Sequence, residues 1–369
     1  MSKKEEEGKI PPHTNLTVNK GIVQPPSINP YLRKNKRKSY NPSEYVENIL
    51  RGNVTVLSQA VTLVESNKYE HQQIAQEIIE KCLPYSGKSQ RIGITGVPGA
   101  GKSTSIDALG MYLVKVQNRK LAVLAIDPSS ERTKGSILGD KTRMEELSRE
   151  SNAFIRPSPS AGSLGGVARK TRETIILCEA AGFDTIFVET VGVGQSETAV
   201  HSMVDFFLLI QLAGTGDELQ GIKRGVMEMA DGIIVNKADG SNIEKANLAA
   251  SQFRNALHLF PTPESGYLPK VLTYSGYYKI GINEIWQMID EYFVFTKANG
   301  YLEHRRNNQA KYWMYESINE QLKSNFYQNE NIINTLKIKE QQVLNSEISP
   351  FVAAKQVLDL YLKQENVML

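Results

Sequence analysis

A glycine-rich stretch between an apolar segment and a helix-like segment could do chemistry on phosphates. Residues 96–104 read Gly-Val-Pro-Gly-Ala-Gly-Lys-Ser-Thr, residues 91–95 have the composition of a short buried strand, and a helical pattern begins at Ser103. Glycines let backbone N–H groups curve around an anion, and a helix N-terminus adds partial positive charge. We therefore predict a phosphate-binding loop, with Lys102 on the β- and γ-phosphates and Ser103 on Mg²⁺. The positions predicted to surround the phosphates are Gly96, Val97, Pro98, Gly99, Ala100, Gly101, Lys102, Ser103 and Thr104.

Carboxylates follow two further apolar runs, where parallel strands would end. Residues 121–126 are followed by Asp127, and a run from residue 184 leads to Glu189, with Gly192 shortly after it. The carboxyl ends of parallel strands line the ligand crevice of an open α/β sheet. We predict that Asp127 and Glu189 hold the metal or its water shell, and that the Gly192 amide meets the γ-phosphate. A simple Asp-Pro turn is the alternative at Asp127.

Two polar segments near these strands supply further candidates. We expect residues 131–166 to form a long polar loop that senses the nucleotide, in which Asp140 reaches the metal; a solvated loop that leads into a helix over 143–149 is the alternative. Gln195 is predicted to position the attacking water, with an ordinary helix-start residue as an equal alternative. The predicted catalytic set is Lys102, Asp127, Asp140, Glu189 and Gln195. The predicted metal ligands are Ser103, Asp127, Asp140 and Glu189.

A second motif indicates which base the site selects. Residues 236–239 read Asn-Lys-Ala-Asp and follow the apolar run 232–235. The Asp239 carboxylate can accept hydrogen bonds from both the ring N–H and the exocyclic amino group of guanine, a donor pair that adenine does not present. Asn236 would brace the loop and Lys237 would pack along the base, so we predict that GTP or GDP binds here. The residues whose backbone could meet the guanine carbonyl, after the predicted strand 270–274, are Ser275, Gly276 and Tyr277.

The elements that must position these residues alternate between strand and helix. This alternation predicts an α/β fold with a doubly wound, mostly parallel sheet. We expect a flexible tail over 1–42, a helical segment over 43–88, the nucleotide domain over 89–296 and a C-terminal helical segment over 297–369. Apolar stripes in the last segment must pack on the N-terminal helices or form a dimer interface.

Composition excludes several classes of protein. The chain has 369 residues and a net charge of +3, so no broad basic surface for nucleic acid is expected. The longest apolar run, 206–213, is too short to span a membrane. Cys82 and Cys178 are predicted to be core thiols, because no disulfide or metal spacing connects them. With no signal-peptide pattern at the start, we expect a cytoplasmic protein without nucleic-acid or membrane partners.

Together, these motifs resemble the MeaB/ArgK family, whose fold is of the P-loop GTPase type. The resemblance runs from about residue 45 to the C-terminus and rests on motifs at 96–104, 125–130, 136–144, 188–197 and 236–239. It implies Mg²⁺-dependent hydrolysis of GTP to GDP and phosphate, and a role as chaperone of an adenosylcobalamin-dependent mutase of the methylmalonyl-CoA mutase type. It also implies a homodimer through the C-terminal helices and a third mobile loop, 213–225, that meets the mutase.

Two other classes of function remain as alternatives. A transport-associated ATPase or kinase is one, because the LAO/AO (ArgK) label has been attached to this family; Asp239 favours guanine over adenine and argues against it. A GTP-dependent metal-delivery protein is the other. It would need a Cys-x-x-Cys motif or a histidine-rich tract, and the sequence has neither.

Overall fold

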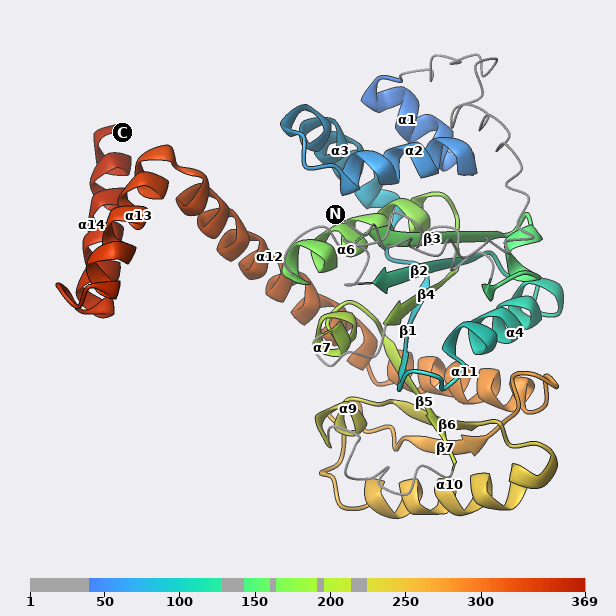
Figure 1. The fold of residues 1–369 in the computed structure, drawn as a ribbon. Helices are drawn as coiled ribbons and strands as arrows, with labels where there is room; N and C mark the ends of the chain where they lie inside the picture. Colours follow the sequence, from blue (N-terminus) through green and yellow to red (C-terminus); the bar gives the residue numbers. More distant parts are fainter. Residues whose placement is uncertain (1–39, 128–142, 160–163, 191–195, 214–223, 369) are drawn as a thin grey trace, which may run out of the picture. The chain divides into compact units, whose positions relative to one another are not determined.

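Seven parallel strands form one sheet (Figure 1). The computed structural model describes residues 40–127, 143–159, 164–190, 196–213 and 224–368. The strand order is β3-β2-β4-β1-β5-β6-β7, and each neighbouring pair is parallel. The strands are β1 (Gln90–Gly96), β2 (Leu121–Asp127), β3 (Ala153–Pro159), β4 (Thr185–Thr190), β5 (Phe206–Leu212), β6 (Gly232–Asn236) and β7 (Lys270–Thr273).

Helices precede, connect and follow the strands. The chain divides into two units, 1–40 and 41–369, and all the elements named here lie in the second. The helices before and between the strands are α1 (Pro42–Leu50), α2 (Val54–Glu65), α3 (Tyr69–Cys82), α4 (Lys102–Lys115), α6 (Leu164–Ala180), α7 (Ser196–His201), α9 (Arg224–Glu228) and α10 (Ile243–Leu257). Those after the last strand are α11 (Ile282–Ala298), α12 (Tyr301–Gln328), α13 (Glu330–Leu344) and α14 (Pro350–Met368).

Helices cover both faces of the sheet. Ile234 of β6 belongs to a core shared with α4 and α11, whereas its neighbours Ile233 and Val235 belong to a core shared with α10. Successive side chains of a strand point to opposite faces, so α10 lies on the face opposite α4 and α11. The residues of β4 and β6 are all buried, as a parallel sheet covered on both faces requires. The predicted doubly wound α/β fold is confirmed, with every strand parallel.

The expected loop over 131–166 contains regular structure that the sequence reading missed. Strand β3 runs within it and pairs with β2, and a short 3-10 helix covers Leu147–Arg149. Pro157 and Pro159 lie in the strand, and proline argues against a central strand because it removes a ladder hydrogen bond. The strand tolerates both because it is at the edge of the sheet, with a neighbour on one side only. The prediction of a loop is therefore wrong for residues 153–159.

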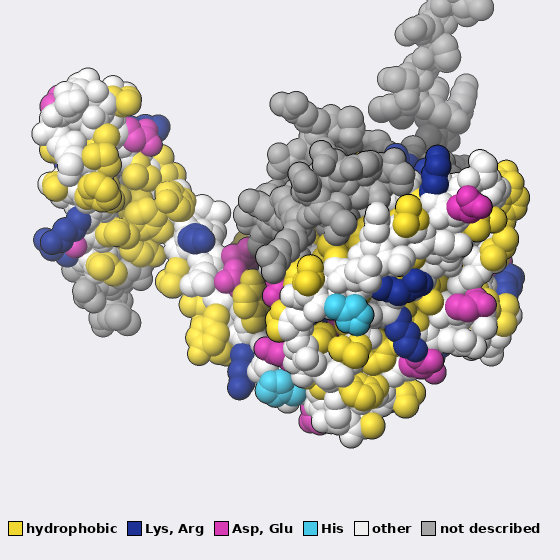
Figure 2. Space-filling model, turned by 90° about the horizontal axis from the view of Figure 1, so that it is seen from below, with side chains coloured by type: hydrophobic (Ala, Val, Ile, Leu, Met, Phe, Trp, Pro, Cys, Tyr) yellow, Lys and Arg dark blue, Asp and Glu magenta, His cyan; other side chains and the backbone are white. Residues whose placement is uncertain are grey.

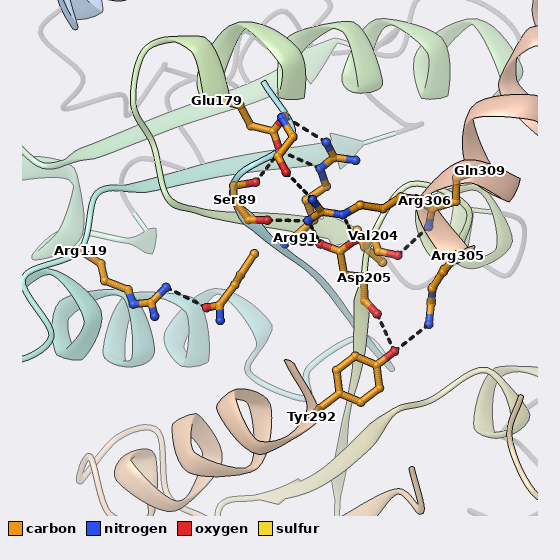
Figure 3. Close-up of polar contacts among 12 residues, drawn as sticks. Ser89, Arg91, Arg119, Glu179, Val204, Asp205, Tyr292, Arg305, Arg306 and Gln309 are labelled. Carbon is orange, nitrogen blue, oxygen red and sulfur yellow. Dashed lines mark hydrogen bonds and ion pairs between the residues drawn. The ribbon is translucent and has the colours of Figure 1, made fainter. Parts of the chain in front are cut away.

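Ion pairs to two buried carboxylates fasten the start of α12 to the amino ends of the strands (Figure 3). Arg306 contacts Asp205, which precedes β5, with Nη2 at 2.6 Å from Oδ2 and Nε at 2.8 Å from Oδ1. Arg305 Nη1 lies 3.4 Å from Oδ2 of Asp231, which precedes β6. Gln309 Nε2 donates to the Val204 carbonyl at 2.7 Å. These contacts hold the first turns of α12 at the amino ends of the strands, whereas the predicted nucleotide loops follow the carboxyl ends.

Two compositional predictions can be compared with the described residues. Cys82 and Cys178 are free and buried, as expected for core thiols. Burial raises the pKa of the Cys82 thiol to about 11 and also raises that of Cys178. Of the helices in the described ranges, none is long and apolar enough to cross a membrane.

Candidate nucleotide-binding site

The glycine-rich loop joins the end of β1 to the start of α4. Gly101 precedes Lys102 with a left-handed φ of +86°, and a Cβ there would lie 2.5 Å from Nδ2 of Asn236. A Cβ on Gly96 would lie 2.3 Å from the carbonyl oxygen of Ile210. Both positions therefore need glycine, because the loop passes directly against its neighbours. The strand, turn and helix around residues 96–104 are arranged as a phosphate-binding loop requires.

Lys102 is a cation held inside the loop. Only 9% of the residue is exposed, and Nζ donates to the carbonyl oxygen of Gly96 at 2.8 Å. Burial lowers the pKa of the Lys102 ammonium, and the nearby carboxylates of Glu189 and Glu197 oppose that effect. An anionic ligand that pairs with this buried ammonium would offset the free-energy cost of burying its charge.

A pocket of about 570 Å³ opens beside this loop. It lies between the phosphate loop and the carboxyl ends of β2 and β4, where the ligand crevice of a parallel sheet is expected. Within it, Ser103 Oγ lies 3.4 Å from Oε1 of Glu189, so two of the predicted metal ligands meet. Its lining residues are Pro98, Gly99, Gly101, Lys102, Ser103, Thr104, Ala125, Ile126, Arg143, Glu189 and Thr190.

The oxygens of Ser103 and Glu189 suit Mg²⁺ bound together with a nucleotide. Mg²⁺ in such sites takes one or two protein oxygens and completes its shell with phosphates and water. The described residues hold no cluster of three or more His, Cys, Asp or Glu side chains arranged for a metal. Asp127 ends β2. Asp140, Gly192 and Gln195 lie outside the described residues, as do positions 214–223 of the predicted third loop.

The predicted guanine loop is bonded to the phosphate loop. Asn236, the last residue of β6, donates from Nδ2 to the Ala100 carbonyl at 2.7 Å. Its Oδ1 accepts from the backbone N–H groups of Lys237 at 2.7 Å and Gly276 at 3.1 Å. Lys237 has a φ of +61°, uncommon for a residue other than glycine and suited to a tight loop held by these bonds. One buried side chain thus joins both predicted recognition loops.

Asp239 is oriented by the segment that follows β7. Its Oδ2 accepts a hydrogen bond from Ser275 Oγ at 2.5 Å, which leaves Oδ1 for other donors. Two of the three predicted backbone donors already have acceptors. The Ser275 N–H donates to the Ile280 carbonyl, and the Gly276 N–H donates to Asn236 Oδ1. Tyr277, which is 79% exposed, follows them.

The sequence reading missed two residues behind these loops, Tyr274 and Ser105. The sequence pattern predicts only that Tyr274 ends a strand, and that Ser105 lies in the helix that begins at Ser103. Their hydroxyl groups are hydrogen-bonded to each other although the residues are 169 positions apart. No local pattern signals a contact of this kind.

Replacing Gly101 by alanine is expected to destabilise the nucleotide-free protein more than replacing Gly99. Both have a left-handed φ, but a Cβ on Gly99 meets nothing within 4 Å, whereas one on Gly101 collides with Asn236. Strain at positive φ costs roughly 1–2 kcal/mol in either variant. Displacing Asn236 should add about 1–2 kcal/mol through lost hydrogen bonds. Urea unfolding of both variants measures the difference; equal free energies of unfolding would contradict the contact.

The fold and the two loops define a P-loop GTPase. The family model described as "Methylmalonyl Co-A mutase-associated GTPase MeaB" matches residues 57–331, and the chain belongs to this family. A probable GTPase of Mycobacterium tuberculosis is 47% identical over 309 residues, which span 84% of this chain and 92% of that protein. GTPase ArgK of Escherichia coli is 44% identical over 315 residues, 85% of this chain and 95% of that protein. The crystal structure of a LAO/AO transport system kinase covers 88% of this chain and 100% of its own, with 36% identity and a TM-score of 0.70. The predicted family and activity class are confirmed.

Proposed function

We propose that this GTPase binds GTP with Mg²⁺ between the phosphate loop and the Asn236–Asp239 loop, and that hydrolysis serves an adenosylcobalamin-dependent acyl-CoA mutase of the methylmalonyl-CoA mutase type. The observation that carries the first part is the position of Asn236, whose amide bonds both Ala100 and Gly276. This contact supports a single site that recognises both phosphate and base.

The residues of the site have different roles in phosphoryl transfer. The backbone of residues 96–101 and the Lys102 ammonium hold the β- and γ-phosphates, while the Ser103 hydroxyl and Glu189 carboxylate hold the metal or its water shell. Bound Mg²⁺ would neutralise charge that develops on the phosphates. Asp127 at the end of β2 and Asp140 complete the proposed metal region, the Gly192 amide meets the γ-phosphate, and Gln195 positions water.

The variant Glu189→Gln is expected to bind GTP about as tightly as the parent and to hydrolyse it at least about tenfold more slowly, because removing a metal-orienting charge impairs the transition state more than the ground state. Asp127→Asn should behave similarly. Isothermal titration and single-turnover hydrolysis separate the two effects. Glu284→Gln, an exposed change at the start of α11, is the control. Parent rates in both site variants would contradict the metal assignment.

The mutase part of the proposal is supported by the family to which the chain belongs, whose description names methylmalonyl-CoA mutase. The motifs at 125–130, 136–144 and 188–197 carry this likeness beyond the generic phosphate loop. Assembly, protection or cofactor gating of the mutase would each couple the nucleotide cycle to a partner. We further propose that the protein works in the cytoplasm, consistent with its free core thiols.

Purified methylmalonyl-CoA mutase from the same cells is expected to change the GTP turnover of this protein. Turnover is measured with and without the mutase, and Lys102→Ala serves as the inactive control. An acyl-CoA enzyme that uses no adenosylcobalamin is the control partner. If both partners leave turnover unchanged and neither binds, the mutase assignment fails.

We also propose a homodimer through the C-terminal helices. Figure 2 shows hydrophobic side chains gathered over this part of the chain. Exposed apolar patches of this extent on a helix face mark interaction surfaces, and most soluble oligomers pair identical faces. Sedimentation velocity of the purified chain measures the state. The large exposed apolar residues on α12–α14 are Tyr312, Met314, Tyr315, Ile318, Leu322, Tyr327, Ile333, Ile338, Leu344, Phe351, Val352, Leu358 and Leu362.

A second candidate is an ATP-dependent transport kinase, since a structural relative carries the LAO/AO kinase name. The hydrogen bond from Ser275 to Asp239 favours guanine, because it orients the carboxylate as an acceptor for guanine's two donors. Competition binding with ATP and GTP decides between the two. Equal affinity for both nucleotides would favour the kinase.

A further inference from the structure

Tyr274 lies between strand β7 and the segment that orients Asp239. Its side chain is buried in the core that α4 and α11 form against the sheet. Its backbone N–H donates to the Val235 carbonyl at 3.0 Å, and its own carbonyl accepts from Ala238 N–H at 3.0 Å. The backbone of Tyr274 therefore holds both sides of the turn that presents Asn236 and Lys237.

The hydroxyl of Tyr274 reaches the phosphate loop. It is hydrogen-bonded to Ser105 Oγ in the first turn of α4, and Ser105 Oγ donates to the Gly101 carbonyl at 2.7 Å. Because the single hydroxyl hydrogen of Ser105 is used on Gly101, Tyr274 is the donor to Ser105. The chain of hydrogen bonds thus runs from Tyr274 through Ser105 to Gly101, the residue before Lys102.

This series of hydrogen bonds is shielded from solvent, and its donors and acceptors keep their roles. Tyr274 is buried, and burial raises the pKa of its hydroxyl, so the group stays protonated as a donor. Hydrogen bonds in such surroundings are stronger than in water, and consecutive bonds reinforce one another. The amide of Asn236 bonds the same two loops, but through Ala100 rather than Gly101. The base loop and the phosphate loop are therefore joined at two successive residues.

We propose that Tyr274 is a positioning residue that transmits base recognition to the phosphate loop. When guanine engages Asp239, the segment 274–276 is held in place, and the Tyr274 hydroxyl holds Gly101 and so the backbone that carries Lys102. A base that engages Asp239 less completely leaves the lysine less well placed for turnover. This inference rests on the proposed function, since it requires GTP in this site.

The test compares GTP with inosine triphosphate (ITP), which lacks the exocyclic amino group and makes one bond fewer to Asp239. Tyr274→Phe keeps the ring in the core and removes only the donor. We expect kcat for GTP to fall about tenfold with KM changed less than about twofold, and kcat for ITP to change little. The ratio of the two kcat values should therefore fall about tenfold. Tyr278→Phe, an exposed change four residues away, should leave the ratio unaltered.

A double-mutant cycle tests whether the hydrogen bonds from Tyr274 through Ser105 to Gly101 cause the change in the kcat ratio. Ser105→Ala should reproduce the effect of Tyr274→Phe, and the double variant should be no worse than either single variant. An unchanged ratio in Tyr274→Phe, with or without a lower melting temperature, overturns the inference, because it leaves Tyr274 as core packing alone. Additive effects of the two variants overturn it as well. If the parent protein does not prefer GTP to ATP, the proposed function itself fails; a parent that prefers GTP isolates the test of Tyr274.

Discussion

Lys102→Ala is expected to abolish tight binding of GTP, with a loss of affinity of at least about a hundredfold. Lys102 is 9% exposed and burial lowers the pKa of its ammonium, so the charge is held in the site at an energetic cost that an anionic ligand offsets. Charged donors aimed at phosphates in water-excluded sites contribute several kcal/mol, on the order of 3 kcal/mol for one group. Isothermal titration with GTP and Mg²⁺ measures the loss.

Two further measurements make this result specific. Lys115→Ala removes a lysine from the same helix, but that side chain is 57% exposed and pairs with Glu150 at the surface, so GTP affinity should not change. The free energy of unfolding of nucleotide-free Lys102→Ala should not fall, because the substitution removes a buried charge. Affinity in Lys102→Ala within about threefold of the parent would remove the lysine from the phosphate site.

Asp239→Asn is expected to weaken GTP binding by roughly 2–4 kcal/mol, because a site built to hydrogen-bond a group strongly rejects a mismatch. The change replaces one acceptor oxygen with a donor, opposite guanine's own donors. Ser275 bonds one carboxylate oxygen of Asp239 at 2.5 Å, so the side chain cannot easily turn away from the base. Competition against a fluorescent guanine nucleotide measures the affinity.

Xanthosine triphosphate should recover much of this loss, since it carries a carbonyl where guanine has its amino group. Asp290→Asn, an exposed change on α11, controls for the loss of a negative charge. Rescue by xanthosine triphosphate in Asp239→Asn, but not in Asp290→Asn, is the expected pattern. Equal loss with both bases would mean that Asp239 supports the loop without contacting the base.

The sequence by itself determined the class of site, because each recognition loop is one continuous stretch of the sequence. The phosphate loop needs a strand, glycines and a helix in immediate succession, and residues 91–104 contain all three. The base loop follows an apolar strand in the same way. Short apolar runs indicate six of the seven strands, all but β3, because strands covered on both faces are largely apolar; the edge strand β7 is only partly buried.

Only the tertiary structure decided how these loops are joined and where the less regular elements lie. Asn236 and Ala100 are 136 positions apart, and Ser105 and Tyr274 are 169 apart. No local sequence pattern therefore predicts their hydrogen bonds. Strand β3 contains two prolines and became recognisable only from its place at the sheet edge. The roles of Asp140, Gly192 and Gln195 stay predictions. Local spacing determines which chemistry a loop can perform, whereas long-range packing decides which loops act on the same ligand.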